Sequence, residues 1–264
     1  YIAGNTQDEI AKKLKVSRAT AQRLVSLCLS ERLITFKLEH PIAACMELAA
    51  RLTDKFSLRY CEVVPTDAVS PNSVTGVANR AAALLESILR ADKPSIIAIG
   101  TGRTMRAAVE QVSPMDCPNH QLVSLVGNIS PDGSASFCDT LARLADLTKA
   151  RHYPVPLPVF LASDAERQQV LKIAPVSRVR ARADKADLRL VGVGQLDQDA
   201  QVYRDGFVTR DQLLEMLRLG AVGEVTAWAI DGEGRVINGG TNKRLNSMPL
   251  PIPAKNLTVG PALG

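Results

Sequence analysis

The segment 95–105, SIIAIGTGRTM, places two glycines, two threonines and an arginine directly after an apolar run. The apolar run is typical of a strand buried on both faces of a parallel sheet, and a helix is expected to begin near residue 103. Glycines let a ligand approach the backbone, and the unpaired N–H groups at the start of a helix favour an anion by about 0.3–1 kcal/mol. A phosphate monoester is the simplest ligand, with close packing of helix on strand as the alternative. The predicted phosphate-binding residues are Gly100, Thr101, Gly102, Arg103 and Thr104.

Other polar residues are expected at the same rim of the sheet, because they follow or begin predicted strands and helices whose ends meet there. Taken singly, each is explained as well by a surface ion pair or a helix cap. Taken together with the glycine turn, they complete a predicted sugar-binding site. These residues are Asn128, Asp139, Gln195, Arg204 and Glu224.

The first forty residues are typical of a helix-turn-helix. Thr6 to Glu9 match a capping box that begins one helix, and Ser17 is a good N-cap for a second. The small residue Ala11 falls where the two helices would cross, and Leu24 is expected to pack the second helix on the first. An ordinary αα-hairpin is the alternative. The exposed face of the second helix carries side chains suited to base edges and phosphates, which are Ser17, Arg18, Thr20, Gln22 and Arg23.

Catalysis would require a base or a nucleophile, and the sequence offers few candidates. The three histidines are His40, His120 and His152, and they belong to no Ser-His-Asp order and no H-E-x-x-H motif. We therefore expect a binding protein with no catalytic residues. The alternative is a sugar-phosphate isomerase or deaminase fused to a DNA-binding module, with Glu224 or Asp139 as the base.

Charge and hydropathy narrow the class of protein. The chain has 264 residues and a formal net charge of +5, and residues 1–40 carry seven lysines and arginines against four acidic residues. This local excess favours a polyanionic partner over a solvated basic face. No apolar run reaches the roughly 18 residues that a membrane span needs. Five scattered cysteines form no C-x-x-C pair and no cluster with histidine, so we expect no metal site and a reducing, cytoplasmic location. We also expect no cofactor.

After the helix pair, the pattern becomes an alternation of strands and helices. Strands are expected at 31–39, 61–64, 95–99, 121–126, 188–193 and 257–259, helices at 41–56, 72–90, 103–112, 136–150 and 209–218, and a hairpin pairing 224–230 with 235–237. The alternation predicts an α/β fold with a doubly wound, mostly parallel sheet. We expect a helix-turn-helix domain over 1–40, a connecting helix over 41–57 and an effector domain over 58–264. The first domain is expected to be incomplete at its N-terminus, because the chain begins at Tyr1.

This combination resembles the SorC family of bacterial sugar-responsive transcriptional regulators. The similarity runs over nearly the whole chain, through TQDEIAKKLKVSRATAQRLV, ERLITFKL, SIIAIGTGRTMRAAVE, LVSLVGN, LRLVGVGQL, LGAVGEVTAWAIDGEGRVI and LTVGPALG. The resemblance implies a helix-turn-helix joined to an effector domain related to the glucosamine-6-phosphate deaminase fold. It further implies that this domain binds phosphorylated sugars without turning them over, and that the domain is incomplete at its C-terminus, because the family continues past the last strand with a helix and another strand.

By position, the resemblance implies that the residues 102–104 hold the phosphate, that Arg204 and Glu224 contact the rest of the ligand and that 137–139 line the pocket. The related deaminases have an acid-Gly-His segment where this chain has Gly-Gln-Leu-Asp at 194–197, which favours a binder over a catalyst. We therefore expect a homodimeric or homotetrameric regulator of sugar or polyol catabolism, whose binding to operator DNA depends on a phosphorylated sugar or polyol. A regulator that senses an unphosphorylated polyol is the alternative.

Overall fold

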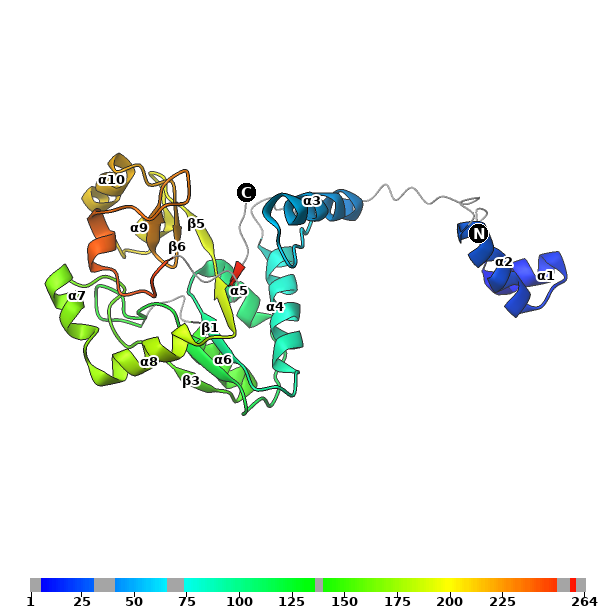
Figure 1. Ribbon diagram of the computed structural model, residues 1–264, viewed down its shortest axis with the longest axis horizontal. Helices are drawn as coiled ribbons and strands as arrows, with labels where there is room; N and C mark the ends of the chain where they lie inside the picture. Colours follow the sequence, from blue (N-terminus) through cyan, green and yellow to red (C-terminus); the bar gives the residue numbers. More distant parts are fainter. Residues whose placement is uncertain (1–5, 31–40, 66–73, 136–139, 251–256, 260–264) are drawn as a thin grey trace. The chain divides into compact units, whose positions relative to one another are not determined.

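The computed structural model describes residues 6–30, 41–65, 74–135, 140–250 and 257–259, and the chain divides into two compact units, Tyr1–Pro65 and Thr66–Gly264 (Figure 1). In the described part of the first unit, the regular structure consists of helices α1 (Gln7–Leu14), α2 (Arg18–Ser30) and α3 (Pro41–Phe56). The expected strand over 31–39 lies outside the described residues.

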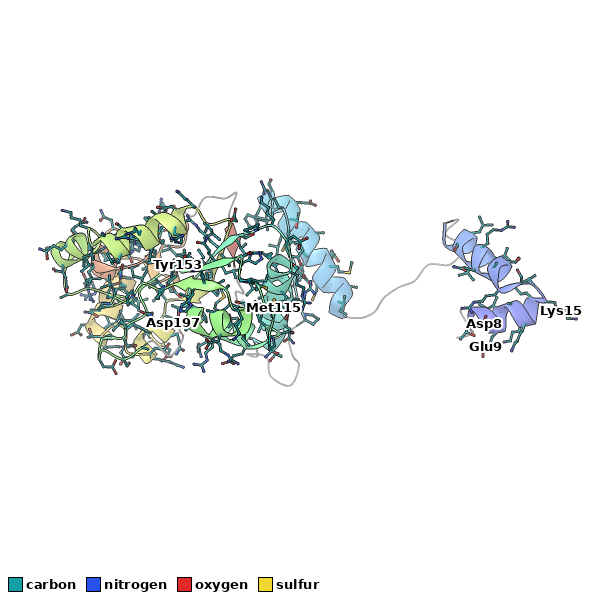
Figure 2. All side chains as sticks on the ribbon, turned by 90° about the horizontal axis from the view of Figure 1, so that it is seen from below. Asp8, Glu9, Lys15, Met115, Tyr153 and Asp197 are labelled. Atoms are coloured by element: carbon teal, nitrogen blue, oxygen red, sulfur yellow. The ribbon has the colours of Figure 1, made fainter. Side chains whose placement is uncertain are left out.

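Helix α1 begins at the capping box that the sequence predicts. The Thr6 N–H donates to Glu9 Oε2 at 2.7 Å, and the Glu9 N–H donates to Thr6 Oγ1 at 3.3 Å. Figure 2 labels Glu9 on this helix and Lys15 at its end, where φ is +54°. Ala11 and Ala21 are buried where α1 and α2 pack together. These two small residues therefore permit the close approach of the helices that the sequence indicates.

The second unit is built on a five-stranded parallel sheet. Its strands are β1 (Ile96–Ile99), β2 (Gln121–Ser124), β3 (Arg151–Tyr153), β4 (Leu188–Val191) and β8 (Leu257–Val259), in the order β3-β2-β1-β4-β8. Every pair of neighbours is parallel. The strand order reverses between β1 and β4, and in such sheets ligands bind at the carboxyl ends of the strands beside that point.

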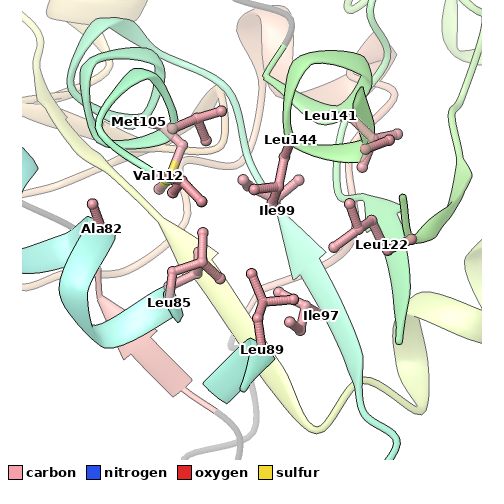
Figure 3. Close-up of a cluster of buried hydrophobic side chains, with 14 of the residues drawn as sticks. Ala82, Leu85, Leu89, Ile97, Ile99, Met105, Val112, Leu122, Leu141 and Leu144 are labelled. Carbon is pink, nitrogen blue, oxygen red and sulfur yellow. The ribbon is translucent and has the colours of Figure 1, made fainter. Parts of the chain in front are cut away.

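Helices cover both faces of this sheet. Helices α4 (Thr75–Leu89), α5 (Arg103–Glu110) and α6 (Leu141–Thr148) bury their apolar sides on one face, together with Ile97, Ile99 and Leu122 (Figure 3). The opposite face buries Ala98 and Val123 against the last turn of α8 (Ala174–Asp184). The alternate residues of β1 thus enter two different cores, which explains why its sequence is apolar without a polar alternation. The fold is the doubly wound α/β fold that the sequence predicts.

A smaller antiparallel sheet follows, in the order β5-β6-β7. It consists of β5 (Val193–Gln195), β6 (Gly223–Val225) and β7 (Trp228–Ile230), and its core also contains side chains of α9 (Gln201–Arg204) and α10 (Arg210–Arg218). The expected hairpin is wrong in its position, because the chain turns at residues 226–227 and pairs β6 with β7. The segment 235–237 contributes only an isolated bridge between Ile230 and Val236.

Three further differences separate the expected elements from the observed ones. Residues 61–64 form no strand, and the sequence does not predict β3, α7 (Asp164–Val170), α8 or α9. The helix expected over 136–150 is observed over Leu141–Thr148, while 136–139 lie outside the described residues. A short 3-10 helix, η1 (Gly240–Arg244), packs near α7 and α10.

In the described part of the chain, no helix combines the length and the apolar character that crossing a membrane requires.

Candidate functional site

The turn between β1 and α5 is fixed at the carboxyl end of the parallel sheet. The Gly100 N–H donates to the Leu190 carbonyl of β4 at 2.8 Å, and Thr140 Oγ1 donates to the Gly100 carbonyl at 3.2 Å. Gly102 is the N-cap of α5 and has a φ of +129°, a value that favours glycine. Among the described residues, no atom lies within 4 Å of the position that a Cβ on Gly102 would take. The turn is therefore accessible on the side of Gly102.

A small polar hollow lies beside this turn, between the ends of β1 and β2. Ser124 and Thr140 supply hydroxyl groups to its wall and Asn128 supplies an amide, while the backbone of Gly100 and Thr101 closes one side. Its free volume of about 10 Å³ admits one water-sized group. A phosphorylated sugar is much larger, so it would have to widen the hollow or extend outside it.

The structure brings together several of the residues that the sequence indicates. Gly100, Thr101 and Asn128 line the same hollow, although Asn128 is separated from the turn by a strand and a helix in the sequence. Arg103 is exposed and Thr104 is half-buried in the first turn of α5. Both side chains therefore begin beside the accessible N-terminus of this helix.

Glu224 lies in a second hollow, whose wall is mainly apolar and includes Leu213 and Met216 of α10. Its Oε2 accepts a hydrogen bond from the Ala227 N–H at 2.7 Å. Burial raises the pKa of the Glu224 carboxyl, and the Ala227 hydrogen bond lowers it by less. The residue opposite Glu224 in β5 is Gly194, where a Cβ would overlap the carboxylate. Gly194 therefore lets the Glu224 side chain lie across β5.

The turn at residues 226–227, between β6 and β7, links the second hollow to the end of β2, which borders the first hollow. Thr226 and Ala227 have φ values of +49° and +68°, which are unfavourable for residues with a Cβ and most unfavourable for a β-branched one. The Thr226 hydroxyl lies 3.2 Å from the Ser247 hydroxyl, which donates to the Leu125 carbonyl at 3.2 Å. Because Ala227 also holds Glu224, this turn links the carboxylate to the end of the parallel sheet.

Two other predicted residues, Gln195 and Arg204, are not brought to either of these hollows. Gln195 is exposed and donates to Asp197 Oδ2 at 2.9 Å. Arg204 is exposed and pairs with Asp199 at 3.4 Å. Both are engaged in local polar contacts because they lie in or just after short surface elements, β5 and α9. Asp139 lies outside the described residues.

The predicted DNA-facing residues lie at the start of α2. Ser17 accepts the Thr20 N–H at 3.1 Å, and the two hydroxyls lie 2.9 Å apart, so Ser17 acts as the expected N-cap. Arg18, Gln22 and Arg23 are exposed, as a recognition face requires. Leu24, which is expected to pack α2 on α1, is 38% exposed, whereas Ala21 of the same helix is fully buried.

Ser124 and Thr140 are polar residues of the hollow that the sequence analysis misses. Ser124 is the last residue of β2, and a hydroxyl at the carboxyl end of a buried strand is the signal that identifies it. Thr140 precedes α6 and has no comparable signal, because its hydrogen bond to Gly100 joins segments 40 residues apart. No group of three or more His, Cys, Asp or Glu side chains that could hold a metal ion occurs within the described ranges.

The chain is similar to known proteins over most of its length. Residues 40–261 match the family model described as "Putative sugar-binding domain". The chain is 28% identical to the erythritol catabolism regulatory protein EryD of Brucella abortus, over 89% of this chain and 74% of that protein. It is 27% identical to the transcriptional regulator LsrR of Klebsiella pneumoniae, over 90% of this chain and 72% of that protein.

A solved structure extends the likeness to the fold. The full-length sorbitol operon regulator SorC from Klebsiella pneumoniae superposes with a TM-score of 0.67 at 19% identity, over 94% of this chain and 80% of that chain. The matched family model covers most of this sequence, and its relatives are transcriptional regulators. The chain therefore belongs to the family described as "Putative sugar-binding domain", and it shares the fold of the SorC regulator.

Proposed function

We propose that this chain controls genes for the breakdown of a sugar or polyol, and that a phosphorylated sugar or polyol bound at residues 100–104 controls its binding to operator DNA. The proposal depends on one observation, the accessible glycine turn beside a hollow lined by hydroxyl groups and an amide. The regulatory relatives support the link to catabolism, since EryD is named for erythritol, a polyol. We propose that the chain binds its effector without converting it.

The phosphate would lie at the N-terminus of α5. Its oxygens would accept hydrogen bonds from backbone N–H groups and from the Thr104 hydroxyl, and the Arg103 guanidinium would add positive charge. Asn128 and the hydroxyl groups of the hollow suit the hydroxyls of the carbon chain. Glu224 would reach the far end of the ligand only after it leaves the Ala227 N–H, which lies 2.7 Å from its Oε2. Arg204 would have to leave Asp199, with which it pairs at 3.4 Å.

Control of DNA binding follows from thermodynamic linkage. A ligand that binds one arrangement of the protein more tightly shifts the population toward that arrangement, and a full switch requires a preference of about 5.5 kcal/mol. Contacts that form only when the hollow widens around the ligand would supply part of this preference. Residues 1–40 would form the DNA-binding domain, 41–57 a connecting helix and 58–264 the effector domain; the family match beginning at residue 40 supports this division.

The active form would be a homodimer or a homotetramer, because helix-turn-helix proteins bind paired half-sites. Helix α3 supports self-association, since it exposes five large apolar side chains along its length. We propose that a second copy of this chain covers them. These side chains are Ile42, Met46, Leu48, Leu52 and Phe56.

Paired ligands test the proposed effector. Erythritol and sorbitol would each be compared with their phosphates by thermal unfolding and by the fluorescence of Trp228, the only tryptophan, which directly follows Ala227. A ligand at 100 times its Kd stabilises the folded protein by about 2.7 kcal/mol. We expect stabilisation by at least one phosphorylated compound and much less by its parent. Equal stabilisation by both members of every pair would contradict a phosphate site, and turnover of any compound would favour the enzyme alternative.

A further inference from the structure

An ion pair joins helices α1 and α2 at the predicted DNA-facing surface. Arg18, the first residue of α2, places its Nε 3.3 Å from Oδ1 of Asp8 in the first turn of α1. Both side chains are largely exposed, at 70% and 58%. An exposed pair of this kind contributes at most about 1 kcal/mol to stability, so its stabilising effect is small. The position of the Asp8 carboxylate, in contrast, affects how Arg18 can contact DNA.

The nitrogen that Asp8 contacts determines what the rest of the guanidinium can do. Arginine carries five N–H groups in a planar fork, and the pair uses the Nε side of it. The two terminal Nη groups lie at the far end of the same planar group, and together they can bind guanine O6 and N7 in the major groove. A carboxylate at Nε therefore restrains the side chain without competing for the atoms that contact a guanine.

Asp8 differs in this respect from the neighbouring acid, Glu9. The Glu9 carboxylate accepts both the N–H and the hydroxyl of Thr6, at 2.7 and 3.0 Å, and so belongs to the capping box of α1. The Asp8 carboxylate instead reaches the first turn of the next helix, and Figure 2 labels the two acids side by side on α1. Buried Ala11 and Ala21 pack α1 against α2, so the backbone that carries Asp8 is held beside the start of α2.

We propose that Asp8 is a positioning residue for DNA recognition, which orients the two Nη groups of Arg18 toward one guanine of the operator. The proposal rests on the proposed DNA binding of α2. It assigns Arg18 to a base edge, whereas Arg23, one and a half turns further along the exposed face, remains a candidate for a phosphate. A residue that orients Arg18 affects the sequence specificity of DNA binding, whereas a purely structural residue affects stability alone. The two roles of Asp8 can therefore be told apart by experiment.

The test uses the full chain and DNA selected by it from a random duplex library. Each guanine of the selected sequence is replaced in turn by 7-deazaguanine, which lacks the N7 acceptor, and dissociation constants are measured by fluorescence anisotropy. For the wild-type chain we expect one guanine whose replacement weakens binding about tenfold. For Asp8→Asn, which keeps the shape of the side chain, we expect the same replacement to cost less than threefold. Binding of Asp8→Asn to an unselected duplex should be unchanged or stronger, because a negative charge is lost, and this binding also shows that the variant is folded.

Glu9→Gln is the matched control, because it removes the same charge from the adjacent residue. It should retain the tenfold sensitivity to 7-deazaguanine. The inference is wrong if Asp8→Asn also retains it, if Glu9→Gln loses it equally, or if no guanine of the selected sequence is sensitive. The proposed function fails separately if the wild-type chain selects no sequence at all.

Discussion

The Thr226 methyl group packs directly against Gly100, since a Cβ built on Gly100 would lie 3.2 Å from Thr226 Cγ2 and 3.3 Å from the Leu190 carbonyl oxygen. Gly100 belongs to the turn that follows β1, and Thr226 belongs to the hairpin turn after β6. The two turns are therefore in contact where the parallel sheet meets the smaller sheet. A change at either turn should affect the other.

Gly100→Ala should destabilise the protein. The added methyl group must displace Thr226 or the backbone of β4, and overpacking of this kind typically costs about 1–3 kcal/mol. We expect a loss of about 1–2 kcal/mol in the free energy of unfolding measured in urea. Gly232→Ala is the control, because among the described residues no atom lies within 4 Å of the Cβ position at Gly232 and its φ is not positive. A Gly100→Ala protein as stable as this control would contradict the contact.

Glu224→Gln should make the stability of the protein less dependent on pH. Burial raises the native pKa of Glu224 above the reference value of 4.5 that applies to the unfolded chain. Between these two pKa values the native state binds more protons, so the associated stabilisation is fully present below pH 4.5 and is lost as the pH rises through the native pKa. Unfolding free energies measured from pH 4.5 to pH 8 should fall for the wild type relative to Glu224→Gln.

The exposed Glu215 of α10 provides the control for this titration. Glu215→Gln removes a carboxylate from the same region and should leave the pH dependence of the wild type in place. Parallel pH curves for the wild type and Glu224→Gln would mean that the carboxylate is solvated in the native protein.

Much of the parallel sheet can be predicted from the sequence, because its strands are buried on both faces. After Ser95, the run 95–99 contains only apolar residues, so none of them marks a face toward solvent. In the structure, the side chains of β1 enter two cores. The hairpin could not be located in the same way. Its turn residues are Thr226 and Ala227, whose type gives no sign of positive φ values, whereas the Gly-containing segment 231–234 has the composition of a turn.

The candidate site could be predicted only in part, for a related reason. The glycine turn is one continuous segment, so its residues and the start of α5 are visible together in the sequence. Thr140 and Thr226 join it through tertiary contacts across 40 and 126 residues, which no local pattern encodes. Gln195 and Arg204 were expected at the rim from their places after a strand, but nearby aspartates hold them at the surface.

Arg23→Ala should weaken DNA binding in a salt-dependent way. Each phosphate contact that is lost lowers the slope of log K against log salt concentration by about one unit. Affinity for a fixed duplex should be measured between 50 and 200 mM salt. Arg218→Ala, which removes an exposed arginine from α10, should leave the slope unchanged. An unchanged slope for Arg23→Ala as well would mean that this face of α2 does not meet the DNA backbone.

Leu52→Glu or Phe56→Glu should reduce self-association. Both side chains belong to the exposed apolar set on α3, and a charge buried between two copies would be strongly unfavourable. Light scattering after gel filtration should show a smaller mass for these variants than for the wild type. Asp54→Lys changes the charge of an exposed residue on the opposite side of the same helix and should not alter the mass. A wild-type chain that is monomeric at micromolar concentration would contradict the proposed pairing.

The most direct test of the central claim is the effect of a phosphorylated effector on DNA affinity when the glycine turn is altered. The double variant Arg103→Ala/Thr104→Val removes two proposed ligand-binding groups at the start of α5, and Arg106→Ala, whose side chain pairs with Glu110 at 2.9 Å, is the control one turn later. With DNA affinity measured by anisotropy, the wild type and the control should respond to the phosphorylated compound that stabilises the protein. The double variant should bind DNA as tightly as the wild type without ligand and show no response. A full response from the double variant would place the effector elsewhere and contradict the account.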